Sequence, residues 1–127
     1  MKYLLDTHAL IWYLEDSVQL ATDSKAIIDE PGSSVYISAA SLWEMAIKSS
    51  LGKLKMDMEL DELFDAVNKS DFAVLQIEQE YLAKLAQLPF LHRDPFDRLI
   101  VATALCEDLV IVTKDENIRG YDVRWVW

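Results

Sequence analysis

Residues 92–116, HRDPFDRLIVATALCEDLVIVTKDE, contain the pattern that decides the fold. The segment 95–108 has the apolar spacing of a helix that begins at a proline, and LVIVT (109–113) is an all-apolar run of strand length. A helix that leads into a wholly apolar strand is typical of a parallel sheet covered by helices. Aspartates stand at both ends of this unit, so we ask whether they cap helices or form a site.

The same alternation of helix and strand runs through the rest of the chain. Short apolar runs predict strands at 2–5, 35–38, 72–77, 109–113 and, as an edge strand, 123–127. Helical spacing and helix signals predict helices at 7–16, 24–30, 39–50, 58–69, 78–88 and 95–108. This order predicts a three-layer α/β fold with a central, mainly parallel sheet of about four to five strands. With no linker-like tract, residues 1–127 are expected to form a single domain.

The chain is strongly acidic, with a net charge of -10 from 22 Asp and Glu against 12 Lys and Arg. A protein that binds nucleic acid by charge alone would be basic. If this protein binds RNA or DNA, bound cations are therefore expected to help hold the phosphates.

Two features indicate the cellular compartment. Asp6 breaks the apolar run at the N-terminus and no small-residue cleavage site follows, so this run fits neither a signal peptide nor a membrane span. Cys106 is the single cysteine and cannot form an internal disulfide. We therefore expect a cytoplasmic protein with no membrane partner.

Four acids are predicted to lie at one edge of the sheet. Asp6 directly follows the first strand, and Asp115 comes two residues after the strand 109–113. Asp97 is in the first turn of the helix that leads into that strand, and Glu44 is on the helix after the second strand. Sites in parallel sheets lie beyond the carboxyl ends of the strands. Since Mg²⁺ and Mn²⁺ prefer carboxylate oxygens, these acids could hold such an ion.

Each acid also has an ordinary structural explanation. Asp6 could cap the helix that follows it, and Asp115 could open a turn. Asp94 fits a helix cap before a proline, where the helix dipole favours Asp97. Four uncompensated carboxylates in one place would repel one another, so a convergent set implies a bound cation.

The position of Glu44 depends on where its helix begins. The segment 41–44, SLWE, matches the S-x-x-E capping box, which would put Glu44 in the first turn. Ser38 could equally be the cap, and Glu44 would then lie in mid-helix.

Four segments that contain these acids stand in order along the chain: LLDTHALIW, SLWEMAIK, DPFDRLIVATA and VTKDE. In this order and at this spacing they resemble the PIN-domain ribonucleases, and most closely the VapC-type toxins of bacterial toxin–antitoxin pairs. The resemblance runs from residue 3 to about residue 121. It implies a three-layer α/β/α PIN-like fold.

The resemblance also implies roles for individual residues. Carried over by position, the family's acidic quartet falls on Asp6, Glu44, Asp97 and Asp115. These acids would bind one or two Mg²⁺ or Mn²⁺ ions and position the water that cleaves RNA, leaving a 5′-phosphate and a 3′-hydroxyl. The family's hydroxyl residue beside the last acid matches Thr113, and Thr7 is a further supporting candidate. Asp94 is then the helix cap that aims the turn, and it could also touch a water bound to the metal.

The partners that the resemblance implies are an RNA substrate, a cognate antitoxin protein and a second copy in a homodimer. Lys48, Lys53 and Lys55 form a local basic cluster, and Arg93 and Arg98 flank the third motif. Contact of Lys48, Arg93 and Arg98 with the RNA backbone is one interpretation, and solvated side chains at a helix end are the other.

Three more residues are left open by the sequence. His8 could approach the scissile phosphate or pack on its own helix. Trp125 and Trp127 could close the core or lie in an interface.

Two alternatives from other classes remain at this point. A phosphoacceptor receiver domain has a similar length and an acidic Mg²⁺ site, but it needs adjacent acids after the first strand, where Asp6 is followed by Thr7. Glu44 would also have no role in a receiver. The other alternative is a catalytically idle PIN-like binding module whose acids only cap helices, and it would show no specific Mn²⁺ site.

Overall fold

The computed structural model describes residues 1–53 and 56–127, and helices and strands alternate along them. In chain order the elements are β1 (Lys2–Leu5), α1 (Thr7–Leu14), α2 (Thr22–Asp29), β2 (Ser34–Ser38), α3 (Ala39–Ser50), α4 (Leu60–Lys69), β3 (Ala73–Leu75), α5 (Gln79–Gln87), α6 (Pro95–Glu107), β4 (Val110–Val112), α7 (Glu116–Arg119) and β5 (Trp125–Val126). Every predicted strand and helix is present. The additional helix, α7, is a single turn where the sequence predicts only a turn.

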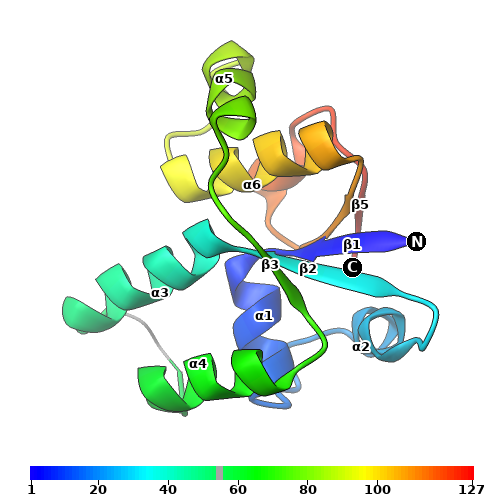
Figure 1. Ribbon diagram of the computed structural model, residues 1–127, viewed down its shortest axis with the longest axis vertical. Helices are drawn as coiled ribbons and strands as arrows, with labels where there is room; N and C mark the ends of the chain where they lie inside the picture. Colours follow the sequence, from blue (N-terminus) through cyan, green and yellow to red (C-terminus); the bar gives the residue numbers. More distant parts are fainter. Residues whose placement is uncertain (54–55) are drawn as a thin grey trace.

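The five strands form one sheet in the order β3-β2-β1-β4-β5, and every neighbouring pair is parallel. Helices α5 and α6 lie on one side of this sheet, and α1, α2 and α4 lie on the other (Figure 1). The predicted three-layer α/β fold is confirmed. A receiver domain has the flavodoxin-like order 2-1-3-4-5, so this topology excludes that alternative.

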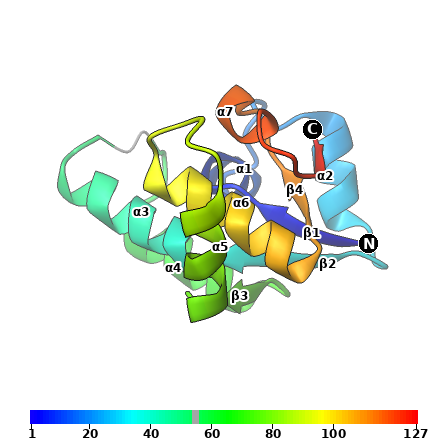
Figure 2. The same cartoon turned by 90° about the horizontal axis from the view of Figure 1, so that it is seen from above.

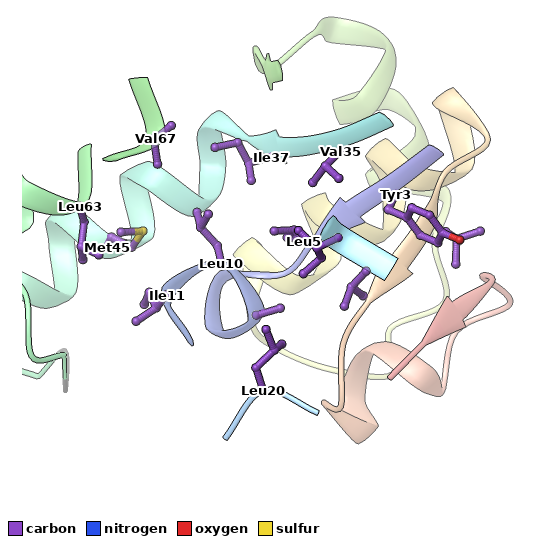
Figure 3. Packing of buried hydrophobic residues seen from close by; sticks show 14 residues of the cluster. Tyr3, Leu5, Leu10, Ile11, Leu20, Val35, Ile37, Met45, Leu63 and Val67 are labelled. Atoms are coloured by element: carbon purple, nitrogen blue, oxygen red, sulfur yellow. The ribbon is translucent and has the colours of Figure 1, made fainter. Parts of the chain in front are cut away.

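The central strand β1 is buried on both faces, which its continuous apolar sequence predicts. Leu5 points into a cluster with Leu10 of α1, Met45 of α3 and Leu63 of α4 (Figure 3). Leu4 points to the opposite face and packs in a second cluster that includes residues of α6. The alternation of successive side chains along one strand therefore joins both helical layers to the sheet.

The order of the strands creates a switch point beside β1. The chain passes from β1 to β2 and β3 on one side, and later adds β4 and β5 on the other side. Ligands of open α/β sheets bind beyond the carboxyl ends of the strands at such a point. In Figure 1 this is the edge where β2 leads into α3 and where α6 begins.

Helix α1 is shorter than predicted and ends at Leu14. Gly52 follows α3 with a φ of 68°, a left-handed conformation that suits glycine at a helix end. Lys55, part of the basic cluster seen in the sequence, lies outside the described residues. Of the helices that the structure describes, none combines the length and the apolar character that crossing a membrane requires.

Candidate metal centre

Asp6 and Thr113 stand side by side because β1 and β4 are in register. Leu5 pairs with Val112, and the Asp6 backbone N–H donates to the Val112 carbonyl at 3.2 Å. The Thr113 hydroxyl then donates to Asp6 Oδ2 at 2.5 Å, while the Ala9 N–H donates to Oδ1 at 2.8 Å. Asp6 is thus a helix cap, as its ordinary explanation predicts, and it is also tied to the end of β4.

The environment of Asp6 disfavours its charged form. Its side chain is almost fully buried, and burial is the main reason why its pKa is raised above the usual value. The hydrogen bonds from Thr113 and Ala9 act in the opposite direction. A cation at this carboxylate would supply the charge that the protein around it lacks.

Glu44 is a buried mid-helix residue, because α3 begins earlier than the capping box suggests. Ser38 is the cap, with its hydroxyl oxygen accepting from the Ala40 N–H at 3.0 Å. Glu44 Oε1 lies 2.6 Å from the Thr7 hydroxyl, and Oε2 lies 2.6 Å from Lys48 Nζ. The capping-box interpretation of residues 41–44 is therefore wrong, and the alternative start at Ser38 is correct.

Thr7 links the two helices that leave β1 and β2. Its hydroxyl lies 2.6 Å from Glu44 Oε1 and 3.0 Å from the hydroxyl of Ser41, which is fully buried on α3. A threonine hydroxyl has one proton, and the carboxylate is the stronger acceptor for it. Thr7 therefore orients the Glu44 carboxylate.

The third acidic position is at the start of α6. Asp94 caps this helix, with Oδ1 accepting from the N–H groups of Phe96 at 2.8 Å and Asp97 at 3.2 Å, and Pro95 occupies the first turn. The cap predicted from the sequence is confirmed. Asp97 follows in the same turn with its side chain 15% exposed.

The pKa of the Asp97 carboxyl is raised by burial and by the other acids of the site. Burial raises its pKa to about 8, and the negative charges of Asp94, Asp115, Glu44 and Asp6 add to the shift. The other three members of the quartet therefore lie within electrostatic reach of Asp97.

Asp115 is joined to Asp6 through Thr113. Its backbone N–H donates to the Thr113 hydroxyl oxygen at 2.9 Å, and the same hydroxyl donates to Asp6. The Asp115 side chain caps α7 by accepting from the Asn117 N–H at 2.9 Å. The predicted turn at Asp115 is thus a one-turn helix.

The four acids are not arranged around a common metal position. Among the described residues, no three His, Cys, Asp or Glu side chains are arranged closely enough to hold a metal ion together. Oxygens of Asp6 and Glu44 are instead hydrogen-bonded to Thr113, Thr7 and Lys48. The donor set itself, all carboxylate and hydroxyl oxygen, fits Mg²⁺ or Mn²⁺.

Two of the three residues considered for RNA contact have protein partners. Lys48 is paired with Glu44, and the Arg98 guanidinium donates to the carbonyls of Leu85 and Leu88 at 3.3 Å each. Arg93 is exposed. Lys114, which directly precedes Asp115, is a basic residue that the sequence analysis did not single out, and its Nζ lies 5.0 Å from the centre of the Trp12 ring.

The two C-terminal tryptophans have different surroundings. Trp127 packs against the apolar cluster and meets Trp12 edge to face, with 5.9 Å between ring centres. Trp125 is 39% exposed, and the Arg119 guanidinium lies over its ring. Trp127 therefore helps to close the core.

The fold and this site define a parallel α/β protein with acids gathered at the switch point of its sheet. The family model described as PIN domain matches residues 3–123. The chain therefore belongs to the PIN domain family, and the resemblance seen in its motifs is confirmed. Among curated protein sequences, none shows significant similarity to this chain.

Several solved structures share the fold. A chain of VapBC2 from Rickettsia felis, bound to a DNA fragment from its promoter, matches with a TM-score of 0.74 and 16% identity over 99% of this chain and 98% of that one. FitAcB from Neisseria gonorrhoeae matches with a TM-score of 0.69 and 23% identity over 98% and 96%. VapBC-5 from Mycobacterium tuberculosis, of the VapBC family of toxin–antitoxin systems, matches with 0.62 and 21% over 95% and 90%. At these identities the likeness concerns the fold.

Proposed function

We propose that this protein, as a single PIN domain, is an endoribonuclease that depends on Mg²⁺ or Mn²⁺. Its ligands for one or two ions would be Asp6, Glu44, Asp97 and Asp115. The observation that carries the proposal is that four elements bring these acids to the carboxyl edge of β1 and β4, where Asp6 and Glu44 are buried. Lys48 already offsets the charge of Glu44, whereas among the described residues no salt bridge reaches Asp6, and a hard divalent cation would supply its counter-charge through oxygen ligands.

The residues around the acids would hold them ready for the ion. Thr113 fixes one oxygen of Asp6, and Thr7 fixes one oxygen of Glu44. Asp94 holds the first turn of α6, on which Asp97 lies. When bound, the ion would acidify a water molecule and offset the charge of the phosphate. The resemblance to the family suggests products with a 5′-phosphate and a 3′-hydroxyl.

The proposed biological role is that of a toxin neutralised by a cognate antitoxin protein. The shared fold with VapBC structures supports this role. A toxin that cleaves cellular RNA would act in the cytoplasm, and we extend the proposal to a homodimer. Of the residues considered for RNA contact, Arg93 is the best placed because its side chain is exposed, whereas Lys48 and Arg98 have protein partners.

The first test needs no knowledge of the RNA. Calorimetric titration of Mn²⁺ should reveal specific binding to the wild type, weakened about tenfold or more by Glu44→Gln. Glu62→Gln, which changes an exposed acid on α4, is the control and should bind Mn²⁺ normally. Binding that ignores Glu44 would contradict the assignment of this ligand.

The second test measures chemistry. The wild type should cleave a pool of random-sequence RNA in Mn²⁺, and Asp6→Asn and Asp97→Asn should fold but lose this activity by orders of magnitude. If either variant cleaved at nearly the wild-type rate, the quartet would be wrong. A wild type that neither binds Mn²⁺ nor cleaves RNA would instead support the idle binding module.

A further inference from the structure

A cavity of about 240 Å³ opens beside the acids, between α1 and the segment that joins β4 to α7. Figure 2 shows α7 leading on from the end of β4. The cavity is lined by Asp6, His8, Trp12, Lys114, Asp115 and Trp127. Since Asp6 and Asp115 belong to the candidate metal centre, the cavity and the centre share a wall.

Aromatic rings form the other wall of this cavity. His8 and Trp12 lie four residues apart on the same face of α1, with ring centres 5.5 Å apart. Trp127 meets Trp12 from the end of the sheet. Both indoles are half-buried and pack against the apolar core, so their positions are fixed while part of each ring lines the cavity.

A positive charge lies at the cavity in a strongly acidic protein. The Lys114 ammonium is held over the Trp12 ring, and among the described residues Lys114 forms no salt bridge. It is exposed and directly precedes Asp115. The arrangement combines an aromatic surface, a cation and the edge of the acidic centre within one small space.

We propose that this cavity receives one unpaired nucleobase of the RNA, next to the phosphate that is cleaved, and that the base stacks on Trp12 while the inclined ring of Trp127 contacts the edge of the base. The Lys114 ammonium would contact the adjoining phosphate. The inference rests on the proposed ribonuclease function and adds a base-binding subsite to it. A stacked base is out of its helix, so the substrate is single-stranded RNA.

The size and chemistry of the cavity favour this occupant. Its volume is smaller than that of a site for a drug-sized molecule, which suits one ring system and not several. Stacking on indole tolerates every base because each base has a π-face, and most polar groups of the lining have other roles in this proposal, Asp6 and Asp115 with the ion and Lys114 with the phosphate. We therefore expect the pocket to require a base without strictly selecting which one.

The test compares two labelled RNA pentamers, oligoadenylate and a fully abasic analogue of the same length. Binding is measured by fluorescence anisotropy, first in EDTA and then with Ca²⁺ as the only divalent ion. Oligoadenylate should bind the wild type and quench its tryptophan fluorescence. The abasic pentamer should bind about tenfold more weakly, the size expected for one stacked base.

Three variants separate stacking from packing. Trp12→Leu keeps an apolar side chain and should bind both pentamers equally weakly. Lys114→Gln changes an exposed side chain and should weaken both pentamers by a similar factor, because it removes a phosphate contact. Trp125→Leu changes an indole outside the cavity and should behave like the wild type.

The outcomes distinguish this inference from the proposed function. The proposed pocket is refuted if oligoadenylate binds under neither condition. It is also refuted if loss of the bases weakens binding to the wild type and to Trp12→Leu by the same factor. A wild type that cleaves RNA in Mn²⁺ without such a preference would refute the pocket alone. A wild type that prefers the base but never cleaves RNA would refute the ribonuclease function and leave the pocket.

Discussion

Thr7 Oγ1 and Glu44 Oε1 lie 2.6 Å apart and link the helix after β1 to the helix after β2. Thr7→Val removes the hydroxyl and leaves a buried carboxylate with one partner fewer. We expect a loss of about 1 kcal/mol of stability and a several-fold loss of Mn²⁺ affinity, because Glu44 is no longer oriented. Chemical denaturation and calorimetry measure the two effects.

Thr103→Val is the matched control for this change. Thr103 is equally buried, but its hydroxyl donates to the Leu99 carbonyl within α6. Its replacement should leave Mn²⁺ affinity unchanged. If both variants lost affinity alike, the effect of Thr7→Val would reflect general loosening of the fold and not the orientation of Glu44.

The raised pKa of Asp97, about 8, predicts how stability varies with pH in the metal-free protein. Because the folded state holds the proton more tightly than the unfolded state, Asp97 stabilises the fold at pH 4 and progressively less as the pH rises towards 8. Asp97→Asn stays neutral, so its free energy of unfolding should fall less over this interval. Urea denaturation in EDTA at pH 5, 6.5 and 8 measures this difference.

Mn²⁺ should act most strongly at the alkaline end of the same interval. The ion binds the deprotonated carboxylate, so it should restore stability to the wild type at pH 8 far more than at pH 5. Asp122→Asn, a change at an exposed acid, serves as the control and should keep the wild-type pH dependence. Parallel curves for the wild type and Asp97→Asn would refute the prediction.

The cap at Asp94 predicts a loss of stability without loss of the metal site. Asp94→Ala removes the acceptor of two N–H groups at the start of α6 and should cost about 1 kcal/mol. Asp94→Asn keeps an oxygen that can cap and should cost less. Thermal unfolding compares the variants, and an Asp94→Ala protein of full stability that no longer bound Mn²⁺ would make Asp94 a metal ligand.

The sequence predicts the sheet and its long helices because their signals are local. Continuous apolar runs such as residues 109–113 and helical spacing such as that of α4 need no knowledge of the rest of the chain. The single turn α7 is too short for any periodicity. Its only sequence signal is Asp115 itself, which fits a turn as well as a cap.

The details of the site depend on contacts between distant segments. Thr7 and Glu44 are 37 positions apart, and only the packing of α1 against α3 brings them together. The pairing of Glu44 with Lys48 does have a local signal, the i, i+4 spacing on one helix. The cavity between Trp12, Lys114 and Trp127 has none, because these residues meet only once β4 and β5 are added to the sheet.

The ion pair between Lys48 and Glu44 makes a prediction of its own, since the ammonium lies where a metal ion would compete for the same carboxylate. Lys48→Met should lower the stability of the metal-free protein by about 1–2 kcal/mol, a value reduced for the partial exposure of the lysine. The same change should raise Mn²⁺ affinity several-fold. Lys69→Met, which breaks an i, i+4 pair with Asp65 on the surface, should alter neither quantity measurably. If Lys48→Met bound Mn²⁺ more weakly than the wild type, the lysine would orient Glu44 for the ion and would not compete with it.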